Sequence, residues 1–221
     1  MNQLRNELAQ TKRSITLFHM EQIEKLIQRQ PVLSTCRSSI EEAGRKLISC
    51  FESGNKLLLC GNGGSCADCE HIAGELVKQF SRPRNLSSEI QQKLGPELSG
   101  ELHGGLPALS LPSMIGFHTA FNNDDNPEFA FAQQVVAFGK PGDILIGIST
   151  SGNSKNVINA ARTAKALGLV VISLTGESGG ELAPLSDLAI LAPANEVPRI
   201  QELHLPIYHA LCQVVEDTMF P

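Results

Sequence analysis

Two side chains that can move protons, His71 and Glu75, lie four residues apart in a segment with helical spacing. Residues at this spacing differ by about 40° around a helix axis, so both side chains face the same side. An imidazole and a carboxylate placed in this way can act as acid and base, or can bind a metal ion together. The same spacing also occurs in ordinary surface pairs, so the pair needs support from the rest of the chain.

The glycine-rich turn just before this pair, residues 61–65, has the composition of an anion-binding loop. It follows the apolar run 56–60 and precedes a helical pattern, which predicts a buried strand, a tight turn and a helix. The glycines let the backbone approach a ligand closely, and the first N–H groups of a helix favour an anion. The turn is neither a Walker loop nor a dinucleotide fingerprint. With His71 and Glu75 it predicts a site that binds a phosphorylated molecule and moves protons on it.

A second turn, residues 149–154, supplies four hydroxyl groups and a run of N–H groups at the start of another predicted helix. Such a nest can hold a phosphate without a lysine, although serine-rich helix starts also serve simply as caps. Both turns leave the carboxyl ends of predicted strands, where the loops of parallel sheets bind ligands. We therefore expect the two turns to meet in one crevice as a sugar-phosphate site.

The elements that must position these residues alternate between strand and helix, which predicts an α/β fold with helices on both faces of a parallel sheet. Residues 82–105 interrupt this rhythm with prolines, glycines and mixed charge, and predict a surface insertion in which 87–94 can form a short helix. The expected strands are 56–60, 106–111, 144–148, 170–174 and 188–191, and the expected later helices are 128–138, 154–167 and 198–220, with a short helix or turn at 114–121.

Residues 1–54 have a helical pattern that Pro31 divides into two helices. Because these helices precede the first strand and have only part of a sheet to cover, we expect them to pack against other copies of the chain. A purely intrachain helical layer is the alternative. Apolar residues of the second helix follow the 3-4-3-4-3 spacing of a heptad seam: Leu33, Cys36, Ile40, Ala43, Leu47 and Cys50.

Composition narrows the class of protein. The chain has 221 residues, of which 42% are hydrophobic, enough for one domain with a large core. A net charge of −5 argues against a general nucleic-acid binder. No apolar run reaches the roughly 18 residues that span a bilayer, and the polar start lacks a secretory pattern, so we expect a cytoplasmic protein. The six cysteines, including Cys66 and Cys69, are expected to be core thiols, since the C-x-x-C pair lacks a second pair for zinc.

Five motifs carry a resemblance to a known family: GNGGS-x5-HIA-x-EL at 61–76, ND at 123–124, GISTSGNS at 147–154, LTG-x2-GG at 174–180 and RIQE-x-H at 199–204, with His209 beyond. With them the sequence resembles the SIS (sugar isomerase) domain, and within it the phosphoheptose isomerases, over residues 56–220 apart from 82–105. The resemblance implies one domain over 1–221, a three-layer αβα sandwich with a flavodoxin-like five-stranded parallel sheet, preceded by two helices.

The resemblance also implies ligands and partners. It implies one zinc ion per subunit, bound by His71, Glu75, Gln201 and His209. It implies a homotetramer that binds a phosphorylated sugar and neither nucleic acid nor membrane. The substrate-binding positions that it implies are Asn62, Gly63, Gly64, Ser65, Glu75, Asn123, Asp124, Ser149, Thr150, Ser151, Ser154 and Gln201.

The expected reaction converts D-sedoheptulose 7-phosphate to D-glycero-D-manno-heptose 7-phosphate, the first step towards ADP- or GDP-heptose for lipopolysaccharide, capsule or another glycan. Moving a proton between adjacent carbons through an enediol needs a base and an acid, for which Glu75 and His209 are the candidates. Gln201 and His209 are separated by roughly 12 Å along a straight helix, so they reach one metal only if side chains lean, the helix bends at Pro206, or another subunit takes part.

Two other functions stay open. Non-catalytic SIS proteins that bind a replication initiator share part of the motif set, but their pattern lacks the acid at Glu75 and the histidine at His209. The other alternative is an isomerase of a different phosphosugar. His204 lies on the helix face of Gln201 and can support the site, whereas His19, His103 and His118 are expected to be structural or solvated.

Overall fold

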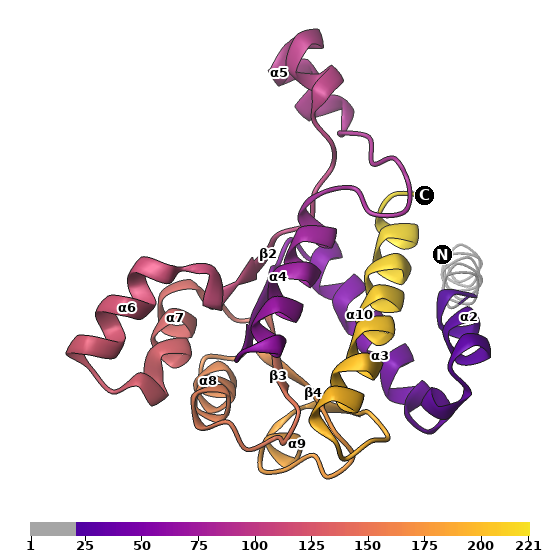
Figure 1. The fold of residues 1–221 in the computed structure, drawn as a ribbon. Helices are drawn as coiled ribbons and strands as arrows, with labels where there is room; N and C mark the ends of the chain where they lie inside the picture. The colour runs from indigo at the N-terminus through magenta and orange to yellow at the C-terminus, as the bar shows by residue number, and fades with distance from the viewer. Residues whose placement is uncertain (1–20) are drawn as a thin grey trace, which may run out of the picture.

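The computed structural model describes residues 21–221, so residues 1–20, with His19 and the start of the predicted helical region, lie outside the described part. Its centre is a five-stranded parallel sheet with the order β2-β1-β3-β4-β5 (Figure 1). This is the flavodoxin-like order, so the predicted α/β architecture is confirmed. The strands are β1 (Leu57–Gly61), β2 (Ala108–Ser110), β3 (Ile144–Ser149), β4 (Val170–Thr175) and β5 (Leu188–Leu191).

Helices lie on both faces of this sheet, and the first described helices come before its first strand in the sequence. None of those in the described residues combines the length and apolar character needed to cross a bilayer. The α-helices are α2 (Glu21–Arg29), α3 (Arg37–Glu52), α4 (Gly64–Val77), α5 (Ser88–Glu101), α6 (Ile115–Asp124), α7 (Ala130–Phe138), α8 (Lys155–Ala166), α9 (Leu182–Leu185) and α10 (Val197–Met219). Short 3-10 helices are η1 (Pro31–Cys36), η2 (Leu111–Ser113) and η3 (Pro127–Phe129).

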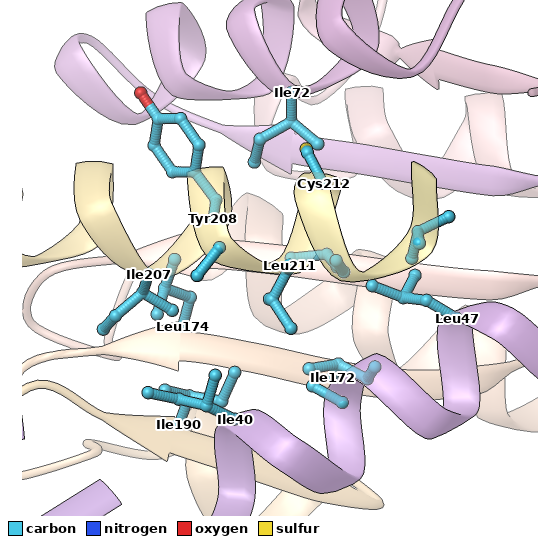
Figure 2. Packing of buried hydrophobic residues seen from close by; sticks show 14 of the residues in the cluster. Ile40, Leu47, Ile72, Ile172, Leu174, Ile190, Ile207, Tyr208, Leu211 and Cys212 are labelled. Carbon is cyan, nitrogen blue, oxygen red and sulfur yellow. The ribbon is translucent and has the colours of Figure 1, made fainter. Parts of the chain in front are cut away.

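Each face of the sheet has its own apolar cluster. Successive residues of a strand point to opposite faces. Leu57 and Leu59 of β1 join the cluster with α3, α4 and α10, whereas Leu58 joins the cluster with α7 and α8. All of β1 is buried, as expected for a parallel strand covered on both sides. Figure 2 shows Ile207 and Leu211 of α10 packed against the sheet in the first cluster.

The heptad seam of the N-terminal region is buried within the chain itself. Its six residues, from Leu33 to Cys50, are at most 5% exposed and belong to the cluster of α3, α10 and the sheet. The seam itself is therefore used within the chain, and the expectation that the N-terminal helices pack against other copies stays a prediction for their remaining faces. The helices find more to cover than the sequence suggested, because α10 returns to lie beside α2 and α3.

Element boundaries differ from the prediction mainly where glycine and proline occur. The strand expected at 106–111 is only Ala108–Ser110, because Leu111 begins a 3-10 helix that contains Pro112. In the insertion, the helix expected at 87–94 ends at a kink at Gly95, whose φ is +75°, and a second helical segment follows to Glu101. No residue of α5 is buried, and Figure 1 shows it standing away from the sheet.

A fully buried ion pair joins the end of α4 to α10. Arg84 Nε donates to Glu216 Oε1 at 2.7 Å, and neither side chain is exposed. The other guanidinium nitrogens of Arg84 donate to the backbone oxygens of Glu75 and Leu76, at 2.7 and 2.6 Å. Cations favour helix C-termini, and these two carbonyls are near the end of α4. Arg84 therefore satisfies two carbonyl groups near the end of α4 and links this end of the helix to α10.

His204 is also fully buried, and it joins α10 to the end of β4. Its Nε2 lies 3.2 Å from the backbone oxygen of Thr175, and within residues 21–221 its Nδ1 has no hydrogen-bond partner. Burial lowers the pKa of His204 from 6.5 to about 4, partly opposed by the Thr175 hydrogen bond. His204 therefore supports the backbone of the Thr175 loop as a neutral imidazole.

The depressed pKa of His204 predicts a loss of stability in mild acid. The unfolded chain binds a proton at this residue below pH 6.5 and the folded chain only near pH 4, so stability falls as the pH drops through this window. The full loss is about 3 kcal/mol, at about 1.4 kcal/mol per pKa unit. Urea unfolding at pH 7 and pH 4.5 measures it. The His204→Gln variant keeps a donor for Thr175 without titrating, and we expect a flatter profile; a profile as steep as that of the unchanged chain contradicts this assignment.

Candidate active site

Three side chains from α4 and α10 meet around Nε2 of His71. This atom lies 3.2 Å from Glu75 Oε1 and 3.3 Å from His209 Nε2. The imidazole rings of His71 and His209 are arranged edge to face, with centroids 4.8 Å apart. The convergence expected from the sequence, of a carboxylate and imidazoles from distant helices, is therefore present within one chain.

The surroundings of this cluster set its charge. Glu75 is 8% exposed, and its Oε2 accepts from Lys78 Nζ at 2.6 Å. Burial lowers the pKa of His209, and the charge of His71 lowers it further, with Glu75 opposing. At neutral pH His209 is therefore neutral and has a ring nitrogen that can accept a proton. Lys78 was missed in the sequence, although its i+3 spacing from Glu75 is a signal that could have found it.

Behind His71 are two residues that the sequence reading did not include. The Tyr208 hydroxyl lies 3.0 Å from His71 Nδ1 and donates to Asp68 Oδ1 at 3.2 Å. Burial raises the pKa of Asp68, with Tyr208 and His71 opposing, and burial also raises the pKa of Tyr208. Asp68 precedes His71 by three residues on α4, so helical spacing could have indicated it. Tyr208 is 137 residues away from His71, and no local pattern connects them.

Gln201 contacts a different turn of α4. A Cβ atom on Gly64 would overlap the side-chain amide of Gln201, so the Gln201 amide lies directly against the backbone of Gly64. Contacts between the two helices then follow in order, from Gly64 with Gln201 to His71 with His209. Gln201 and His209 are eight residues apart on α10, and their contacts on α4, Gly64 and His71, are seven residues apart. The helix α10 continues without a break through Pro206. Binding of a single metal by Gln201 and His209 stays a prediction.

The glycine-rich turn and the serine-rich turn lie side by side, as predicted. They follow the neighbouring strands β1 and β3, and the side-chain amides of Asn62 and Asn156 form two reciprocal hydrogen bonds of 2.9 Å. Ser149 and Ser154 lie with their hydroxyl oxygens 3.0 Å apart. Neither α4 nor α8 has a side-chain hydrogen bond from its N-cap residue. The N–H groups of Ser65 and Cys66 already donate to backbone oxygens, and that of Val157 donates to Asn156 Oδ1, so only part of each helix start is open to a ligand. Asn156, which ties the turns together, was not predicted.

Glycines of the motif at 174–180 pack directly against the backbone of the serine-rich turn, residues 149–154. A Cβ atom on Gly152, whose φ is +68°, would overlap the backbone of Gly179 and Gly180. The backbone N–H of Gly176 also donates to the oxygen of Thr150 at 3.0 Å. The motif therefore shapes the 149–154 turn through direct backbone packing.

Asn123 and Asp124 are not brought to the cluster within one chain. They are exposed at the end of α6, and Asn123 Nδ2 donates to Asp124 Oδ1 at 2.9 Å. Figure 1 places α6 beyond α7, on the side away from α10. Their role in substrate binding stays a prediction.

The side chains of the cluster are of the types that bind zinc, but their positions do not form a closed metal site. Imidazole nitrogens and a carboxylate oxygen are ordinary zinc ligands, and ligands about 2.1 Å from a tetrahedral zinc are spaced by roughly the separations found around His71 Nε2. In residues 21–221, however, no three His, Cys, Asp or Glu side chains enclose one point as a formed metal site does. The residues fit the ion chemically, and closure of the site would require side-chain adjustment.

Five of the six cysteines are buried core thiols as predicted, whereas Cys66 is only partly buried. Cys60, Cys69 and Cys212 are buried, and all six cysteines are free. Burial raises the pKa of Cys60 and Cys212 to about 12, so these thiols stay protonated. The prediction that they form no disulfide frame agrees with the described structure.

Comparison with known proteins connects this fold and site to a family. The SIS domain family matches residues 19–99 and 104–176. Because this match covers more than half of the chain, the chain belongs to the SIS domain family.

Its relatives narrow the family further. The phosphoheptose isomerase of Aliarcobacter butzleri is 38% identical over 203 residues, which are 92% of this chain and 94% of that protein. That of Aneurinibacillus thermoaerophilus is 42% identical over 181 residues, 82% of each chain. The solved phosphoheptose isomerase of Francisella tularensis has a TM-score of 0.72 and 33% identity, over 87% of this chain and 93% of that one. Within the SIS family, this chain belongs with the phosphoheptose isomerases.

Proposed function

We propose that the protein is a phosphoheptose isomerase that converts D-sedoheptulose 7-phosphate to D-glycero-D-manno-heptose 7-phosphate. The observation that carries the proposal is the meeting of Glu75, His71 and His209 between α4 and α10. The turn that opens α4 is joined to the serine turn through Asn62 and Asn156, so an anion site adjoins the helix that carries the base.

Each part has a chemical task. The uncapped starts of α4 and α8, with the hydroxyls of Ser151 and Ser154, bind the phosphate and so fix the far end of the sugar. The Glu75 carboxylate removes a proton from the carbon next to the ketose carbonyl and returns it to the neighbouring carbon of the enediol. His209, neutral at working pH, exchanges protons with the sugar oxygens.

We further propose a zinc ion held by His71, Glu75 and His209, with Gln201 as a candidate fourth ligand. The support is electrostatic: a carboxylate oxygen and two imidazole nitrogens face one another at 3.2 and 3.3 Å, and such lone pairs repel unless a proton or a cation lies between them. When bound, zinc would polarise the carbonyl and hydroxyl oxygens of the sugar.

Turnover tests the function directly. The purified full chain, incubated with sedoheptulose 7-phosphate, is expected to form the aldose 7-phosphate, and removal of metal with a chelator is expected to reduce the rate until zinc is returned. A parallel panel of five-, six- and seven-carbon ketose phosphates identifies the preferred substrate. Absence of turnover with and without zinc would favour a non-catalytic SIS protein, and a faster reaction with another sugar would replace the proposed substrate.

The finer properties implied by the family belong to the same proposal. They are a homotetramer, a cytoplasmic location and use of the product in heptose nucleotides for lipopolysaccharide or another glycan. Two large apolar side chains, Ile115 on α6 and Val136 on α7, are exposed and are candidates for contact with another copy. Sedimentation of the purified chain measures the assembly.

A further inference from the structure

The contacts behind His71 form a chain with one direction. The Tyr208 hydroxyl has a single proton, and it donates that proton to Asp68 Oδ1 at 3.2 Å. The same oxygen lies 3.0 Å from His71 Nδ1 and can then only accept. A neutral His71 can therefore donate to this oxygen only from Nδ1, which leaves a lone pair on Nε2, the atom that faces Glu75 and His209.

We propose that Asp68 and Tyr208 are positioning residues, which hold His71 in the Nδ1–H tautomer and direct its Nε2 lone pair at Glu75 and His209. The inference deepens the proposed function and rests on it for its catalytic meaning. Ligands such as this imidazole depend on a partner for their second nitrogen, which fixes both the tautomer and the ring orientation.

Burial makes the arrangement rigid. The Tyr208 ring is 2% exposed and packs beside Ile72 and Cys212, while its hydroxyl leaves this apolar cluster (Figure 2). Within residues 21–221, Asp68 Oδ2 is buried with no hydrogen-bond partner. The negative charge of Asp68 is therefore satisfied mainly through Tyr208, which strengthens its pull on the hydroxyl proton.

The tautomer can be measured without substrate or metal. Solid-state NMR of protein labelled with 15N-histidine distinguishes Nδ1–H from Nε2–H, and a difference spectrum against His71→Gln assigns the signal among the six histidines. We expect Nδ1–H at His71 in the unchanged chain. In Tyr208→Phe, which keeps the ring in the core, we expect a mixture of tautomers and a loss of zinc affinity of about 10- to 100-fold in a competition titration. Thr218→Val removes another hydroxyl from α10, one that donates to the backbone oxygen of Val214 on the same helix, and should change neither readout.

Asp68→Asn provides a second test in case Tyr208→Phe does not fold. It removes the charge that attracts the hydroxyl proton, so the Nε2–H tautomer is expected to increase. Unchanged tautomer and zinc affinity in a folded Tyr208→Phe or Asp68→Asn variant would overturn the proposal. Because the tautomer is read in the free protein, Nδ1–H without any turnover would refute the isomerase function and leave the positioning role intact.

Discussion

Purified Glu75→Gln protein is expected to convert sedoheptulose 7-phosphate at least about 10²-fold more slowly than the unchanged chain, chiefly in kcat. Glutamine keeps the size of the side chain but cannot accept a proton from carbon. Glu75 is buried and contacts His71. The other described contacts of His71 include no second carboxylate that could act as the base in its place. Steady-state kinetics with product analysis measures the loss.

His209→Gln is expected to lose at least about 10²-fold as well, because an amide cannot exchange protons as a neutral imidazole does. A double variant should lose little more than the worse single one if the two residues act as one unit. Glu42→Gln makes the same chemical change on the exposed face of α3, beside Arg45, and should keep full activity. Substantial turnover by both folded single variants would mean that base and acid are assigned to the wrong residues.

Glu216→Gln is expected to destabilise the fold by about 3–5 kcal/mol, since it leaves the charge of Arg84 buried without a counter-charge. Burial raises the pKa of Glu216, but hydrogen bonds from Ser81, from the Phe80 and Ser81 amides and from Arg84 outweigh it and hold the pKa below its usual value. The NH2 group of the glutamine would also face some of these N–H and O–H donors, and it cannot accept their hydrogen bonds. Chemical unfolding at fixed protein concentration measures the change.

Two further variants separate the ion pair from general damage. Glu202→Gln breaks an exposed pair with Arg199 on the same helix, and should cost no more than about 1 kcal/mol. A double variant, Arg84→Leu with Glu216→Leu, should be less destabilised than the sum of its single changes, because neither charge is then left alone. Equal, small effects of Glu216→Gln and Glu202→Gln would show that the buried pair contributes little.

The sequence predicted those features that local patterns encode. Buried apolar runs such as 144–148 are at the correct places, and the turns after β1 and β3 were expected to meet because both leave carboxyl ends of parallel strands. His71 and Glu75 share a helix face by spacing alone. Strand order and family followed from the resemblance of the motifs rather than from periodicity.

Features that depend on tertiary contacts were missed. The heptad seam has the same spacing whether its partner is another copy or α10, so the pattern could not choose between them. Tyr208 reads as one more apolar residue in the stripe of α10, and only its contact with Asp68 and His71 gives it a chemical task. Arg84 lies in a segment that the sequence assigned to the surface, yet it is buried because Glu216 is there to receive it.

The position of α10 in the chain affects how activity arises during protein synthesis. The last strand, β5, ends at Leu191, whereas Gln201, His209 and Glu216 all follow it. A ribosome therefore completes the sheet and both ligand-binding turns before it makes half of the catalytic groups. The cluster of His71, Glu75 and His209 can form only when this final helix docks beside α4.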